Sequence, residues 1–431
     1  MTVLTPQAPV RATPRPVHQR WLAKLGPGLI TGAADDDPSG IATYSQAGAQ
    51  FGMNLLWTML LTWPLMVGVQ TISARIGRVT GKGLSGNMRE RFPRALLYAI
   101  VGLLVGANTV NIAADIGAMG DALALIVGGP AHLYAAGFGL VSLLLQVFVP
   151  YSRYVRLLKW LTLGLLAYVA VVFTVKIDWR ELGIALVAPR LAWDKATILT
   201  IVAVFGTTIS PYLFFWQAAQ EVEEMGAHPE RLPLKAAPQQ ARASFRRINV
   251  DTVVGMGFSN LVAFFIILTT AVTLHAHGIT QIDTAADAAA ALRPVAGPFA
   301  FVLFAAGIIG TGMLAVPVLA GSAAYATAGA FGWAKGLEHK PSVAKGFYAI
   351  IAVSTLGGVA LCFMPIDPIK ALFWSAVING VVAVPIMAAM MVIGADTGVM
   401  GRFAIGPRLK WLGWLATGAM LVAVLAMLFV M

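Results

Sequence analysis

The sequence predicts an all-α integral membrane protein with about eleven transmembrane helices. Of its 431 residues, 58% are hydrophobic and only 11% are charged, whereas a soluble globular chain carries roughly 25% charged residues. The apolar residues also fall into blocks of roughly 20 residues, the length that an α-helix needs to cross the hydrocarbon core of a bilayer. These two observations exclude a large soluble enzyme, and we expect no enzymatic activity.

Charged or small residues separate the apolar blocks and so mark the predicted spans. The spans cover residues 25–50, 54–74, 95–118, 133–149, 157–175, 197–220, 249–274, 298–328, 346–364, 369–393 and 410–430. Residues 1–24 are predicted to form a disordered cytoplasmic tail, and 25–393 the membrane-embedded core. Residues 410–430 are an additional helix. The segment 221–247 holds three prolines and a basic end, which predicts a cytoplasmic loop.

The positions of the basic residues predict the orientation of the chain. Starting from the N-terminus, alternate inter-span segments hold 24 of the 30 Lys and Arg residues. Cytoplasmic loops carry this excess, so the N-terminus is expected in the cytoplasm and the C-terminus outside. The net charge of +11 then faces anionic lipid headgroups, which leaves no support for a nucleic-acid partner. We therefore predict a multi-pass protein of the cytoplasmic membrane.

Two predicted spans are interrupted near their middles by polar residues, proline and glycine. In the first span, three consecutive carboxylates and Pro38 lie between Gly32 and Gly40. In the sixth span, hydroxyl side chains and Pro211 lie between Gly206 and Tyr212. Proline removes a backbone donor and clashes with the preceding turn, so both helices are expected to unwind there.

Unwound backbone at membrane depth is tolerated only where it is buried in protein or lines a wet cavity. Broken helices at matching positions of two halves indicate a transporter built from inverted repeats, here about 25–175 and 197–393, five spans each. An ordinary proline kink is the alternative, and it stays open for the sixth span. In the first span, a carboxylate at the bilayer centre costs about 2.5–3.5 kcal/mol, which favours a functional role for Asp37.

Four segments of the first half of the chain form recognisable motifs: LGPGLI at 25–30, DPSGIAT at 37–43, QAGAQFG at 46–52 and ARIGRVTGK at 74–82. Together they resemble the start of the NRAMP family of proton-coupled divalent metal transporters. The resemblance is specific over roughly residues 25–90 and weaker afterwards. It implies a five-plus-five inverted repeat of the LeuT-like kind, with a divalent cation as substrate and no cofactor.

This chain differs from the NRAMP family at several motif positions. The family motif Asp-Pro-Gly-Asn supplies two metal ligands, and here Asp37 is kept while Gly40 stands at the Asn position. The family motif Met-Pro-His has become Ser210, Pro211 and Tyr212. A carbonyl ligand three residues before the Met falls on Thr207. The resemblance thus implies a cation site at these positions that lacks the sulfur, the imidazole and one amide.

These exchanges change the expected selectivity. A thioether favours soft transition metals, whereas carboxylate, hydroxyl, carbonyl and water oxygens favour hard ions such as Mg²⁺. Gly40 also opens space for a partly hydrated ion, and Mg²⁺ keeps several waters when bound. We therefore predict a divalent cation transporter that favours hard ions. The alternative is a transporter of a small organic solute on the same fold, without divalent metal transport.

Further polar residues are candidates for the site or for a path to it. Asp36 and Asn379 are also assigned to the substrate site. Asp115, Asn108 and Asn111 share helical spacing in the third span, where they either line a proton or water path or satisfy interhelical hydrogen bonds. The family's Asp-x-x-Glu on the proton route is Asp115 with Ala118 here, which puts proton coupling in doubt. The expected partners are the cation and the lipid bilayer, and the chain is expected to be a monomer.

Overall fold

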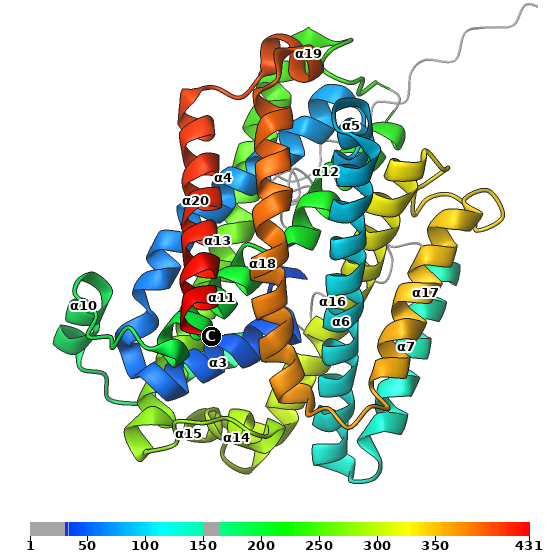
Figure 1. Ribbon diagram of the computed structural model, residues 1–431. Helices are drawn as coiled ribbons and strands as arrows, with labels where there is room; N and C mark the ends of the chain where they lie inside the picture. The colour runs from blue at the N-terminus through cyan, green and yellow to red at the C-terminus, as the bar shows by residue number, and fades with distance from the viewer. Residues whose placement is uncertain (1–30, 33, 150–163, 229) are drawn as a thin grey trace, which may run out of the picture.

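The structure is a computed structural model that describes residues 31–32, 34–149, 164–228 and 230–431. Every regular element in these ranges is helical, and the long helices form one bundle (Figure 1). The described elements of the first predicted repeat, with the helix that follows it, are α3 (Pro38–Phe51), α4 (Trp57–Thr80), α5 (Leu84–Arg91), α6 (Arg94–Val127), α7 (Ala131–Phe148), α9 (Leu166–Val172) and α10 (Trp179–Val187). The predicted tail at 1–24 lies outside the described residues.

The second predicted repeat and the last span contain the remaining helices. They are α11 (Lys195–Thr208), α12 (Pro211–Gly226), α13 (Ala241–Thr273), α14 (Ala285–Ala290), α15 (Arg293–Ala296), α16 (Ala300–Phe331), α17 (Lys345–Leu361), α18 (Pro368–Ala395), α19 (Thr397–Met400) and α20 (Pro407–Val430). Short 3₁₀ turns join several of them. The described helices extend over most of the predicted spans, so the all-α prediction is confirmed.

The number of clear spans in the described residues is smaller than the predicted eleven. Seven helices are long and apolar enough to cross a membrane, or up to eight if α3 with its following turn and α4, which meet at 108°, count as one span. Three causes account for the difference. The predicted spans 25–50 and 157–175 include residues outside the described ranges, α17 has only 17 residues, and α4, the predicted span 54–74, passes only together with α3 as one bent pair.

Both predicted interruptions are present as short breaks. Asp37 has an extended backbone (φ −71°, ψ 168°) directly before α3. Ile209 (φ −110°, ψ 59°) and Ser210 (φ −73°, ψ 127°) separate α11 from α12. Pro38 and Pro211 each begin the second half-helix, where a missing backbone N–H has no helical partner to lose. The unwinding prediction is therefore confirmed at both positions.

Small residues let the broken helices approach their neighbours. A Cβ atom added to Gly206 in α11 would lie 2.1 Å from the Ala376 carbonyl oxygen of α18, and one added to Gly32 would lie 2.3 Å from the Gly255 carbonyl oxygen of α13. Such small residues allow close packing between membrane helices. The segment before the first break thus packs closely on α13, and α11, which ends at the second break, packs closely on α18.

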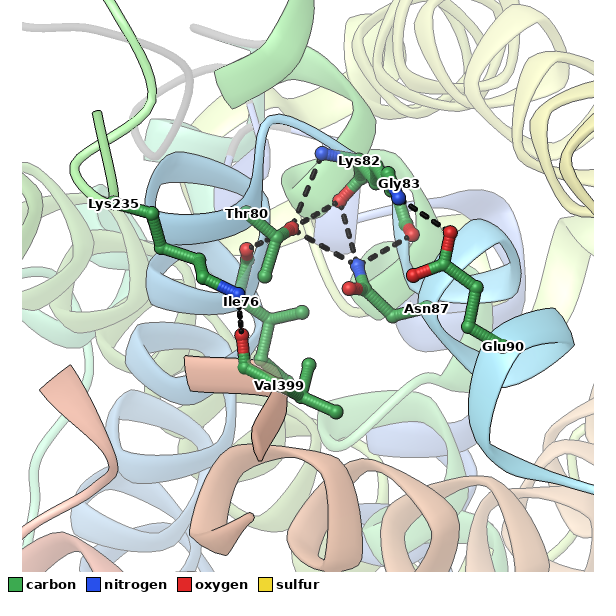
Figure 2. A network of polar contacts seen from close by, with 8 residues as sticks. All are labelled: Ile76, Thr80, Lys82, Gly83, Asn87, Glu90, Lys235 and Val399. Atoms are coloured by element: carbon green, nitrogen blue, oxygen red, sulfur yellow. Dashed lines mark hydrogen bonds and ion pairs between the residues drawn. The ribbon is translucent and has the colours of Figure 1, made fainter. Parts of the chain in front are cut away.

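The end of the bundle that carries α5 and α19 is the predicted cytoplasmic end (Figure 1). There, Asn87 Nδ2 donates to the carbonyl oxygens of Lys82 (2.9 Å) and Gly83 (3.0 Å) and to Thr80 Oγ1 (3.1 Å). Figure 2 shows this network, in which Lys82 also pairs with Glu90. These bonds fix the corner between α4 and α5.

The predicted loop at 221–247 is shorter in the structure. Helix α12 continues to Gly226 and α13 begins at Ala241. The two helix ends are held together because Arg247 pairs with Glu221 (2.5 Å) and Glu224 (2.9 Å). The side chain of Glu221 is fully buried, although an acid at the end of a predicted span is usually solvated.

Topology can be tested with single cysteines in a Cys362→Ser background. Ala236 lies in the α12–α13 connection and is exposed, whereas the adjacent Ala237 is 1% exposed and unsuitable. An impermeant thiol reagent applied to intact cells should leave Ala236→Cys unlabelled until the membrane is permeabilised, because basic residues place this connection inside. Ala188→Cys, exposed after α10, should be labelled at once. The reverse pattern would invert the proposed orientation.

Candidate functional site

Asp37 stands at the centre of the first break and is 2% exposed. Its Oδ1 accepts a hydrogen bond of 2.7 Å from the backbone N–H of Gly40, so the carboxylate caps the N-terminus of α3. An aspartate is among the favoured residues at this position because it accepts from an otherwise unpaired backbone donor. The local sequence therefore fixes the side chain at the beginning of the half-helix.

The other carboxylate oxygen of Asp37 is reached from two further helices. Asn111 of α6 donates to Oδ2 from its amide at 3.1 Å, and Tyr212 of α12 donates from its hydroxyl at 3.3 Å. Among the described residues, no Lys, Arg or His forms an ion pair with Asp37. A buried carboxylate is thus surrounded by neutral donors.

The second break contributes oxygen atoms of Ser210 and Thr207. The Ser210 hydroxyl donates to the Thr207 carbonyl oxygen at 2.7 Å and lies 3.1 Å from the Gly206 carbonyl oxygen. Across from it, a Cβ atom added to Gly40 would lie 3.3 Å from Thr207 Oγ1. The sequence-predicted residues Gly40 and Thr207 are therefore in contact. The Ser210 proton is used within α11, which leaves the hydroxyl oxygen able to accept or to ligate.

Asp36 points to a different neighbour. Its Oδ1 and the Oδ2 of Asp35 accept from the same hydroxyl, Ser259 Oγ of α13, at 3.0 Å and 2.7 Å. Ser259 was not predicted from the sequence, because a single serine in an apolar helix of 33 residues carries no signal. The structure thus brings Asp37, Gly40, Thr207 and Tyr212 together and places the Asp36 carboxylate against α13.

The remaining candidates lie on α6 and α18. Asn108 donates to the Leu319 carbonyl oxygen (2.9 Å) and to Ser322 Oγ (2.7 Å), so it ties α6 to α16. Asp115 and Asn379 are 0% exposed, and within the described ranges no other side chain bonds to either of them; the backbone N–H of Ser39 faces the Asp115 carboxylate. Asp115 interacts electrostatically with Asp37. Buried polar atoms are normally paired, so unpaired ones point to a ligand or to water.

The site is not a chelating cluster of the usual kind. In the described part of the chain, no group of three or more His, Cys, Asp or Glu residues could hold a metal ion. One carboxylate with neutral oxygens instead suits a cation that keeps part of its water, since direct protein ligands are few.

Comparison with known proteins identifies the family. A family model described as "Natural resistance-associated macrophage protein-like" matches residues 28–430. The chain belongs to the NRAMP family. Similar relatives are named divalent metal cation transporter MntH: that of Burkholderia ambifaria is 25% identical over 91% of this chain and 85% of the relative, and that of Deinococcus radiodurans is 29% identical over 70% and 67%. This NRAMP chain is accordingly a membrane transporter and not an enzyme.

Solved structures agree with the fold of this NRAMP chain. A crystal structure of the Eremococcus coleocola manganese transporter matches with a TM-score of 0.72 at 18% identity, over 97% of this chain and 88% of the other. A structure of MhsT in complex with L-phenylalanine matches with a TM-score of 0.56 at 14% identity, over 94% and 97%. At such identities the likeness shows the fold alone. The predicted LeuT-like architecture is confirmed.

Proposed function

We propose that this chain carries a divalent cation across the cytoplasmic membrane, with hard ions such as Mg²⁺ favoured over soft transition metals. One observation carries the proposal. Asp37 is a buried carboxylate at a helix break, and the donors that reach it are neutral. A charge at this depth requires a positive partner, and broken helices are where such transporters bind their solute. The names of the MntH relatives support a divalent ion.

The preference for hard ions rests on the chemistry of the other groups. Ser210 and Tyr212 present hydroxyl oxygens at the positions where the family motif has sulfur and imidazole. Gly40 supplies only its backbone N–H, which is already donated to Asp37. Oxygen ligands and a partly retained water shell suit Mg²⁺. In this proposal Thr207 and Asn379 offer further oxygen ligands to the cation, and the Asp36 carboxylate lies at the edge of the site.

The contacts of Asn108, Asn111 and Asp115 on α6 suggest a different role for each residue. Asn108 bonds α16 and Asn111 bonds Asp37, so both serve hydrogen bonding between helices. Asp115 is the only acid of the three, and no other side chain of the described residues bonds to its carboxylate. We assign it to a water path beside Asp37. Ala118, 2% exposed, has no group that can carry a proton.

Ion binding and uptake test the proposal directly. Purified protein would be titrated in a calorimeter with Mg²⁺, Ca²⁺, Mn²⁺, Cd²⁺ and a set of small amines and carboxylates, and uptake of the same solutes measured in proteoliposomes. Mg²⁺ should bind and enter, with little preference for Cd²⁺, because hard oxygen ligands do not select soft ions. Binding of an organic solute without any divalent ion would replace this proposal with the organic-solute alternative.

A further inference from the structure

A cavity lies away from Asp37, at the predicted cytoplasmic end. It has a volume of about 490 Å³ and lies between α5, α12, α16 and the connection from α16 to α17. Its lining includes Ser85, Phe215, Ala219, Glu223, Tyr325 and Lys335. We call it the exit chamber. The α4–α5 corner of Figure 2 fixes one wall, because Gly83 belongs both to that network and to the lining.

One face of α12 connects Asp37 with the exit chamber. Tyr212, Trp216, Ala219 and Glu223 are spaced by four, three and four residues, which places them on the same side of an α-helix. Tyr212 contacts Asp37, while Ala219 and Glu223 line the chamber. Eleven residues of helix rise about 16 Å. A cation leaving Asp37 along this face would reach the chamber after about three turns.

Trp216 separates the two sites. It is 0% exposed, and its ring packs against Gly321 of α16, where an added Cβ would lie 2.7 Å from the ring. Tyr325 stands edge-on to Trp216, with ring centroids 6.0 Å apart and planes at 71°. The barrier is therefore aromatic and fits only because α16 has a glycine at that position.

The exit chamber contains a carboxylate without an ion-pair partner. Glu223 accepts a hydrogen bond of 3.0 Å from the Tyr325 hydroxyl, and within the described residues it forms no salt bridge. Glu338 and His339 also line the cavity. Lys335 faces it as well, and burial, together with the neighbouring Arg89 guanidinium, holds the pKa of Lys335 below its usual value.

We propose that the exit chamber is a second cation station, in which Glu223 receives the hydrated divalent ion after it passes Trp216. The identity of the cargo rests on the proposed function. The ion keeps its water here because the described residues hold no cluster of three metal-ligating side chains. Lys335 repels the ion, so the station releases it toward the cytoplasm instead of trapping it.

Protection of a cysteine in the exit chamber tests the station. Val222 lines the chamber and is half-buried, so Val222→Cys in a Cys362→Ser background would be labelled with a charged thiol reagent in purified protein. Saturating Mg²⁺ should slow labelling about fivefold relative to NaCl of equal ionic strength. Glu223→Gln should abolish this protection. Glu181→Gln, an exposed acid on α10, should leave it intact.

Two further variants keep the test decisive if Glu223→Gln misfolds. Lys335→Met should strengthen protection, since it removes a repelling charge, whereas Lys335→Arg should not. Equal labelling with and without Mg²⁺, or protection that survives Glu223→Gln, would overturn the station. If Mg²⁺ protects the cysteine but is not taken up into proteoliposomes, the station is retained and the proposed function is refuted. If Mg²⁺ is taken up but does not protect the cysteine, the proposed function is retained and the station is refuted.

Discussion

Asp37→Asn is expected to abolish cation uptake while the protein stays folded. The hydrogen bond from the Gly40 N–H to the Asp37 side chain is 2.7 Å long, and an asparagine side chain can still accept it and so can still cap α3. It loses the charge, and its amide nitrogen replaces the oxygen that accepts from Asn111 and Tyr212. Two unit charges 4 Å apart attract by about 4 kcal/mol at an effective dielectric constant of about 20, which is about a thousandfold in affinity. Uptake of Mg²⁺ into proteoliposomes should therefore fall to background.

Matched variants separate the charge from the cap. Asp37→Ala removes both and should cost about 1 kcal/mol of stability in addition to uptake. Asp178→Ala removes an equivalent cap from α10, where Asp178 accepts from the N–H groups of Arg180 (2.9 Å) and Glu181 (3.1 Å). It should leave uptake unchanged. Thermal melts would confirm folding of each variant, and uptake above half of the unmodified rate in Asp37→Asn would refute the role of Asp37.

The breaks were predictable because a lipid environment makes polar and proline residues conspicuous. Asp37 and Pro211 interrupt apolar blocks, and hydrocarbon penalises such residues unless the backbone around them is buried in protein or binds a solute. The short helices α5, α10 and α14 were not predicted. Each has nine residues or fewer and lies between spans, where hydropathy blocks carry no information.

The partners of the polar residues were not predictable, because they depend on which helix faces meet. Asp36 and Asp37 are adjacent in sequence, yet the backbone unwinds at this point and directs them to Ser259 and Asn111, respectively. Asn108 and Asn111 share one face of α6 but bond to different helices. Apolar periodicity does not encode these choices, since nearly every face of a buried membrane helix is apolar.

The contacts in and beside the exit chamber were likewise not predictable from the sequence. Gly321 gave no more signal than the other glycines of a glycine-rich span, yet it accommodates the Trp216 ring. In the sequence, Glu223 stands among other acids just after the sixth predicted span, a pattern typical of a solvated helix end. In the structure its carboxylate accepts from Tyr325, about one hundred residues later in the chain. Only the approach of α12 to α16 makes this pair visible.

Restoring the family's motif residues should shift the ion selectivity away from Mg²⁺ and toward Cd²⁺ and Mn²⁺. Ser210→Met places a thioether at the second break, two residues before Tyr212, which contacts Asp37, and Gly40→Asn adds an amide oxygen. A polarisable sulfur binds soft ions more strongly than a hydroxyl does, so the ratio of Cd²⁺ or Mn²⁺ uptake to Mg²⁺ uptake should rise. A rise of about tenfold or more, equal to about 1.4 kcal/mol of relative binding free energy, is expected for the double variant.

Position 40 sets a physical limit on this conversion. A Cβ atom there would lie 3.3 Å from both Thr207 Oγ1 and Tyr44 Cε2, so these neighbours must shift by a few tenths of an ångström. Ser210→Met alone should therefore give most of the change. Ser210→Leu is the matched control, since it has similar size and no sulfur, and it should lower uptake of all ions without favouring Cd²⁺. Calorimetry with Mg²⁺, Mn²⁺ and Cd²⁺ on each variant measures the shift. An equal shift in Ser210→Leu would assign selectivity to size and not to sulfur, and no divalent binding in any variant would refute the metal site.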